Sequence, residues 1–250
     1  MATLPNALPK LAADPTGRAL GLGLPPGRLT GTLLWHADAV AAPGDWAAFG
    51  KARAAGLIPL LIDVGGSQGG PERWELVPDA ASYPGDHDPE EVLAEYWEDL
   101  ADDDWPGLAP EPEPAGPDPD AVATDLAEHL LTDGTWLKEP RLALVPARRS
   151  ADIAAAIGWS GPVNHEDDVA RLCAVLRSWE DRFGIRVVAL TSDQLIVSVA
   201  APPTTPEAAR AVTAEHYAFC PDDVDRSGLP TLDAYAEQLI DREFWSFWWD

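Results

Sequence analysis

The sequence of 250 residues contains only two cysteines, Cys173 and Cys220. Two cysteines are too few for the disulfide framework of a small secreted domain. Residues 1–5 also lack the basic stretch and the apolar stretch of a secretory signal. We therefore expect a cytoplasmic protein whose thiols are reduced.

Long apolar runs are absent as well. The longest, such as residues 57–62 and 195–201, fall far short of the roughly 18–20 residues that span a bilayer. We therefore expect no membrane segment. Hydrophobic residues still make up 46% of the chain, which is enough to bury the core of a globular protein.

Basic residues are scarce, because 17 Lys and Arg face 42 Asp and Glu, giving a net charge of −25. Residues 86–139 hold 18 of these acids and a single base, Lys138, for a net charge of −17. Such a field repels phosphate, so we expect no nucleic-acid partner. Two interpretations remain: a solvated face that keeps the protein soluble, or a surface that binds a basic protein.

Proline and acidic residues alternate over residues 111–120, a composition that cannot form a packed core. We predict a semi-rigid linker over 105–120. It would separate a smaller α/β region, residues 1–104, from a C-terminal α+β domain, residues 121–250.

In the first region, we predict a helix over 45–55 and a helix starting at Pro89 with Asp88 as its N-cap. Pro59 places the apolar strand 57–63 at an edge or an irregular position. The other predicted strands are 29–35 and 74–77.

The C-terminal domain is predicted as α+β, with helices packed on a mixed or antiparallel sheet. From its first strand onward the order is β-α-α-β-β-α-α. The predicted strands are 141–145, 185–190 and 194–200, and the helices are 121–131, 151–157, 165–183, 205–219 and 232–240. For helix 165–183, Asn164 is the expected N-cap and Gly184 the C-terminal stop.

Several stretches of this domain resemble the bacterial domain-of-unknown-function family 4253, over about residues 140–250. The resemblance implies a fold unit and an intracellular bacterial setting, and it supplies no catalytic residues. It is carried by residues 141–147, Gly158-Trp159 with Asn164, residues 176–184, residues 214–222 and the closing residues 247–250.

His216 and Cys220 are the weak metal-site candidates, because positions i and i+4 of a helix share one face. Asp222 and Asp223 are nearby oxygen donors. The alternative is that both side chains pack in the core. A nucleophilic Cys220 is disfavoured, because the C-terminal end of a helix raises the pKa of a thiol.

A polar ligand pocket is a further hypothesis, in which Glu180 and His216 face a ligand near Trp159 and Asn164. Alternatively, Trp179 packs inward while its charged neighbours pair on the surface. The full candidate set is Trp159, Asn164, Arg177, Trp179, Glu180, His216, Cys220 and Asp222.

Two short motifs lack the residues that their functions require. Residues 158–162 have Pro162 where a nucleophile elbow needs glycine. The glycine-rich residues 65–70 have neither dinucleotide-binding nor P-loop spacing. We therefore expect no cofactor.

The last seven residues, 244–250, carry five large aromatic rings. Each buried aromatic side chain removes roughly 150–250 Å² from water, so this terminus is expected to dock. We predict that Trp245, Trp248 and Trp249 lock the C-terminal domain against the helix of Trp179 and the 185–200 hairpin.

Two classes of function stay open. The first is a non-catalytic protein whose acidic surface binds a basic protein, for instance an immunity-type protein that neutralises a toxin. The second is an enzyme or sensor that binds a small molecule or a metal through His216, Cys220 and Glu180.

Overall fold

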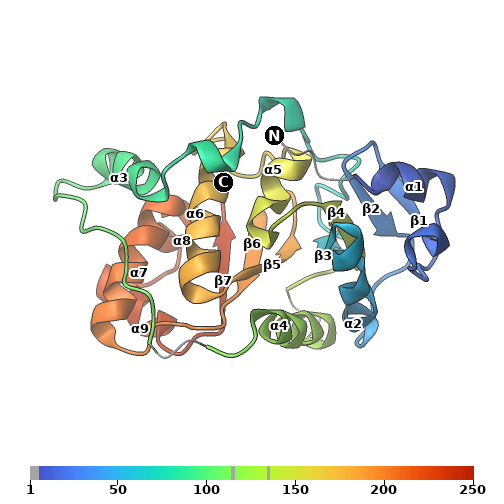
Figure 1. Ribbon diagram of the computed structural model, residues 1–250. Helices are drawn as coiled ribbons and strands as arrows, with labels where there is room; N and C mark the ends of the chain where they lie inside the picture. The colour runs from blue at the N-terminus through green and yellow to red at the C-terminus, as the bar shows by residue number, and fades with distance from the viewer. Residues whose placement is uncertain (1–5, 114–115, 134–135) are drawn as a thin grey trace.

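One mixed sheet organises the protein in a computed structural model that describes residues 6–113, 116–133 and 136–250. Its strand order is β1-β2-β4-β3-β5-β6-β7 (Figure 1). Only the β3–β5 pair is parallel. The predicted α+β class is confirmed. The strands are β1 Gly27–Thr30, β2 Leu34–Ala37, β3 Leu57–Asp63, β4 Pro140–Pro146, β5 Arg186–Leu190, β6 Gln194–Ser198 and β7 Phe244–Trp248.

Strand β3 lies in the centre of the sheet, so the edge position, one of the two alternatives predicted from Pro59, was wrong. Proline is tolerated there because β3 pairs with β5 only through Leu61 and Ile62, whereas Pro59 is paired with β4 alone. Every residue of β3 is buried. An unbroken apolar run is typical of a strand covered on both faces.

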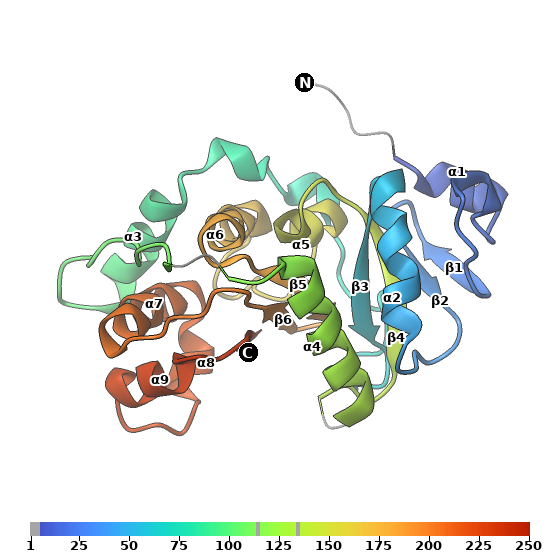
Figure 2. The same ribbon diagram turned by 60° about the horizontal axis from the view of Figure 1, so that its bottom comes forward.

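Helices cover both faces of the sheet (Figures 1 and 2). Successive β3 residues, such as Leu60 and Leu61, point to opposite faces of the sheet and belong to different hydrophobic clusters. One cluster contains α3 Pro89–Leu100, α5 Ile153–Ile157, α6 Val169–Phe183, α7 Pro206–Phe219, α8 Pro221–Asp225 and α9 Leu232–Leu239. The other contains α1 Leu8–Ala13, α2 Asp45–Phe49 and α4 Pro119–Asp133. Short 3₁₀ helices span Arg18–Leu20, Gly50–Ala55, Pro78–Ala80, Pro84–Asp86 and Ser150–Asp152.

Local boundaries in the first region differ from the predictions at two strands. The predicted strand 29–35 is a hairpin of β1 and β2, because Gly31 adopts a left-handed backbone with φ 56° and turns the chain. The predicted strand 74–77 is reduced to one bridge, between Leu76 and Trp159.

The N-cap of α3 is as predicted, because the Asp88 side chain accepts from the Glu90 and Glu91 amides. That of α6 is not. Asp168 caps α6 by accepting from the Ala170 amide, and the helix begins at Val169. Asn164 instead donates its side-chain amide to the carbonyl of Asp250.

The aromatic tail forms the edge strand β7, which the predicted order lacked. It pairs antiparallel with β6 along its whole length. Trp245 and Phe247 point into the core, and the Phe247 ring stacks on the Trp179 ring at 5.4 Å. Trp249 is also buried, whereas Trp248 is half-buried. The tail thus packs on α6 and the β5–β6 hairpin.

Strands from both sides of the 105–120 segment share this sheet, since β3 lies between β4 and β5. The division into two units at that segment stays a prediction. The structure adds that Ala109 within the segment is buried and bonded to α6 and α7 through Arg182 and Glu215.

Removing the Trp245 side chain should destabilise the protein strongly, because it is 2% exposed and its ring contacts Trp179 and Phe183. We expect Trp245→Ala to lower the free energy of unfolding by roughly 3–5 kcal/mol in urea denaturation. The control is Tyr83→Ala, at an aromatic residue outside the tail that is 46% exposed, with an expected loss of about 1 kcal/mol or less. Equal losses in the two variants would contradict a locking role for the tail.

Candidate functional site

The structure divides the sequence-predicted pocket residues into three groups. Trp179 and His216 come together in the aromatic core, with ring centroids 5.2 Å apart. Trp159, Asn164, Cys220 and Asp222 lie around the C-terminal residues. Arg177 and Glu180 lie elsewhere on α6. The eight residues therefore do not form one pocket.

His216 is completely buried on α7, against the rings of Trp245 and Phe247. Burial lowers its pKa to about 3, and the charge of Arg242 acts in the same direction. Its Nδ1 lies 3.1 Å from the Tyr235 hydroxyl, while Nε2 has no hydrogen-bond partner in the described part of the chain. The imidazole is therefore neutral near pH 7.

Cys220 ends α7, and its thiol donates to the carbonyl oxygen of Trp248 at 3.1 Å. Burial raises the pKa of this thiol and raises that of Cys173 to about 12. Both side chains are therefore protonated thiols near neutral pH, a state that suits neither a nucleophile nor a metal ligand. Nowhere in residues 6–113, 116–133 and 136–250 do three His, Cys, Asp or Glu side chains gather as they would around a metal ion.

The second group secures the chain end. The Asp250 amide donates to the Asp222 carboxylate, and the Asp250 carbonyl accepts from Asn164. The Trp159 ring lies edge-on to Trp249 at 5.6 Å. These residues position β7 and its last residues.

Arg177 and Glu180 form ion pairs and hydrogen bonds with residues on another side of α6. Arg177 pairs with Asp152 at 2.5 Å. Glu180 accepts from the Ala151 amide and lies near Arg149 and Arg186. The expected convergence of Glu180 with His216 is not present.

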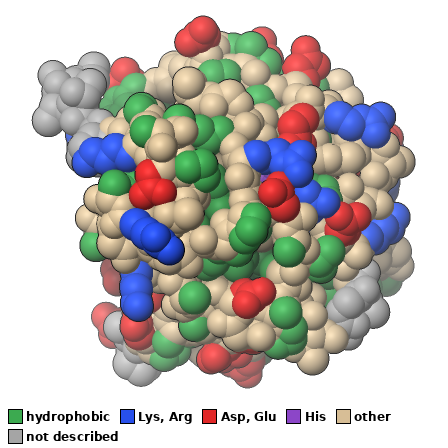
Figure 3. Space-filling model, turned by 90° about the vertical axis from the view of Figure 1, so that its right-hand side faces the viewer, with side chains coloured by type: hydrophobic (Ala, Val, Ile, Leu, Met, Phe, Trp, Pro, Cys, Tyr) green, Lys and Arg blue, Asp and Glu red, His purple; other side chains and the backbone are tan. Residues whose placement is uncertain are grey.

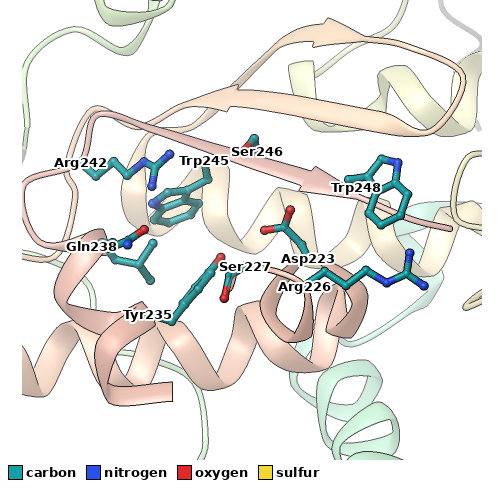
Figure 4. A pocket seen from close by; sticks show the side chains of 10 residues that line it. Asp223, Arg226, Ser227, Tyr235, Gln238, Arg242, Trp245, Ser246 and Trp248 are labelled. Carbon is teal, nitrogen blue, oxygen red and sulfur yellow. The ribbon is translucent and has the colours of Figure 1, made fainter. Parts of the chain in front are cut away.

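A cavity of about 270 Å³ lies where α8, α9 and β7 meet (Figure 4), and two of its lining residues, Tyr235 and Trp245, also contact His216. We call it the α8–α9–β7 pocket. Its charged and aromatic lining residues are Asp223, Arg226, Tyr235, Arg242, Trp245 and Trp248.

Asp223 lies between the two arginines of this pocket in Figure 4. Burial raises the pKa of its carboxyl to about 6, while the Arg242 charge and the Tyr235 hydroxyl oppose the shift. Burial likewise raises the pKa of Tyr235. The hydroxyl of Tyr235 thus stands between the buried His216 and the Asp223 carboxyl.

Asp223 was predicted only as an oxygen donor, and Tyr235, Arg226 and Arg242 were not predicted as site residues. The one signal in the sequence was their proximity, since all four lie within residues 223–242. Bringing them to one cavity requires the turn at Asp241, whose φ of 56° is left-handed, and the docking of β7.

A second candidate feature is the acidic segment, which we define as residues 86–113. It contains twelve Asp and Glu and no Lys or Arg. All twelve are exposed. By contrast, residues 1–85 hold six bases against seven acids, and the face around α1 and β1 shows both signs interspersed (Figure 3).

In a comparison with protein families, residues 141–250 match the model of a domain of unknown function, DUF4253. The resemblance of the C-terminal part is therefore confirmed. Neither the search of curated proteins nor that of solved structures found a match. The α8–α9–β7 pocket lies inside the matched range, and the acidic segment lies outside it. Within the described part of the chain, every helix is too short or too polar to cross a membrane.

His216 should make the protein sensitive to acid. A histidine in the unfolded chain has a pKa near 6.5, whereas that of folded His216 is about 3. Its stabilising contribution is therefore present above pH 6.5 and is lost as the pH falls from 6.5 toward 3. We expect His216→Phe to flatten the decline of the free energy of unfolding over this window.

Urea denaturation at several pH values measures this dependence, and His129→Gln, at an exposed position of α4, is the control. An unchanged slope in His216→Phe would show that the folded protein accommodates the imidazolium.

Proposed function

We propose that the protein is a non-catalytic binding protein whose acidic segment engages a basic protein partner. The observation that carries this proposal is the density of exposed carboxylates in residues 86–113, a segment without Lys or Arg in which Glu95 is paired with Arg171 of α6. Fields of one sign raise the rate at which an oppositely charged partner associates and disfavour partners of like charge.

The acidic side chains of α3 are placed in a way that does not stabilise the helix at its C-terminal end, which supports a role in binding. The helix buries Val92, Leu93, Tyr96 and Trp97, and its outer face is acidic. Its first-turn acids suit the positive end of the helix dipole, but Glu98 and Asp99 lie at the negative end, where no base is present. Each such carboxylate costs roughly 0.3–1 kcal/mol at an exposed helix end.

The stretch after α3 is fixed rather than free to rearrange. The Trp97 indole donates to the Asp103 carbonyl at 2.8 Å, and its ring meets that of Trp105. Ala109 is held from both sides of its peptide group, its amide by Glu215 and its carbonyl by Arg182. A surface that is ordered before binding loses less conformational entropy when a partner docks.

A basic protein fits this surface better than a nucleic acid, whose phosphates would be repelled. A basic toxin neutralised by an immunity-type protein is one partner of this chemistry. Both cysteines are free buried thiols, which supports a reducing, cytoplasmic setting for the interaction.

Neutralising three carboxylates of α3 tests the proposal. Glu91, Glu98 and Asp99 are exposed and are replaced by Gln, Gln and Asn. The matched control replaces Glu207, Glu237 and Glu243 by Gln, at exposed positions elsewhere, so that both variants carry the same net charge. Each full-length protein is immobilised and exposed to lysate from its host at low and at high salt.

We expect a basic protein that wild type and control retain at low salt, and that the α3 variant and high salt each release. With that partner purified, the α3 variant should raise Kd at least roughly tenfold, the effect of losing several partly screened charge contacts. If no retained protein distinguishes the α3 variant from the control, the acidic segment serves solubility only.

A further inference from the structure

The α8–α9–β7 pocket is lined by a buried donor for which the described residues supply no acceptor. The Trp245 side chain lines the cavity and is 2% exposed, yet its indole Nε1 has no hydrogen-bond partner among the residues that the structure describes. A buried donor without an acceptor is costly, and most such groups in native proteins are satisfied. Because Nε1 itself is buried, an acceptor in the cavity reaches it only after a small shift of the surrounding side chains, and such a contact would remove this cost.

Arg242 adds a positive charge at the same end of the pocket, where its guanidinium lies beside the Trp245 indole nitrogen (Figure 4). It is half-buried and packs over the Phe244 ring at 4.5 Å. Among the residues that the structure describes, no carboxylate forms an ion pair with Arg242 within 4.0 Å, although the Arg242 charge acts on the nearby Asp223 carboxyl. In a chain of net charge −25, an unpaired arginine that lines a cavity is well suited to an anionic group of a ligand.

Arg226, at the other end of the pocket, differs from Arg242 because it already has an ion-pair partner. It pairs with the Asp250 carboxylate at 2.6 Å and lies over the Trp248 ring. The pocket thus offers one available positive group, Arg242. Its one carboxyl, that of Asp223, lies between the two arginines and is mostly ionised at pH 7.5, above its pKa of about 6.

A pocket with one available cation and one carboxylate is complementary to a ligand that carries both signs. A polyanion would be repelled by Asp223, and a simple cation would be repelled by Arg242. The volume of about 270 Å³ restricts the ligand to a small molecule.

We propose that this pocket binds a small zwitterion of the α-amino-acid type, with its carboxylate on Arg242 and the Trp245 indole and its ammonium group on Asp223. Tyr235 and Trp248 form apolar walls for the side chain of the ligand. This binding is separate from that of the acidic segment, so the two can be tested independently.

The test uses the full-length protein at pH 7.5 and the twenty common amino acids, screened by ligand-observed NMR and measured by calorimetry. At least one should bind. Its N-acetyl derivative, which lacks the ammonium group, and its carboxamide, which lacks the carboxylate, should each bind at least roughly tenfold more weakly.

Three variants assign the contacts. Arg242→Gln should weaken the amino acid at least roughly tenfold, and Asp223→Asn should weaken the amino acid but not its N-acetyl derivative. The control Arg210→Gln removes an exposed ion pair with Asp233, outside the pocket, and should bind as wild type does. Circular dichroism confirms that each variant is folded.

Absence of binding by all twenty amino acids to the folded wild type would overturn the proposal. So would equal affinity for the amino acid and both derivatives, or unchanged affinity in the folded Arg242→Gln and Asp223→Asn variants.

Discussion

The buried carboxylate of Glu215 is the group on which the C-terminal architecture depends. It is fully inaccessible, and an unpaired carboxylate in such a place would be strongly destabilising. Two Arg182 nitrogens donate to it at 2.8 and 2.6 Å, with the Trp179 indole at 2.7 Å and the Ala109 amide at 2.6 Å. Helix α6, helix α7 and the segment around Ala109 must therefore meet at one point.

Two features with proposed functions lie on either side of this point. By accepting from the Ala109 amide, the Glu215 carboxylate holds the C-terminal part of the acidic segment, the segment that also contains α3. Through Trp179, it orients the ring on which Phe247 and Trp245 pack, and these residues belong to β7. Strand β7 in turn forms a wall of the α8–α9–β7 pocket. Folding of the terminal strand and formation of both surfaces are thus consequences of the same buried contacts.

Local chemistry in the sequence predicted much of the helical structure. Asp88 with Pro89, and Gly184 after α6, mark helix ends through contacts within a few residues. The position of β3 was not predictable, because Pro59 is accommodated by the short pairing with β5, which only the tertiary structure reveals. For the pocket, the sequence indicated Asp223 but not Arg242, since their approach depends on the turn at Asp241. Glu180 and His216 do not face a common ligand site, because Glu180 on α6 accepts from the Ala151 amide whereas His216 on α7 contacts Tyr235.

Hydrogen exchange at the Ala109 amide tests the central role of Glu215 most directly. Glu215→Gln removes the charge that Arg182, Trp179 and Ala109 share, and Glu207→Gln, at an exposed position of the same helix, is the control. Our account predicts that exchange accelerates at Ala109 and across residues 101–113 in Glu215→Gln, while amides of β4 and β5 in the sheet centre are affected less. Unchanged protection at Ala109 in a folded Glu215→Gln protein would contradict it.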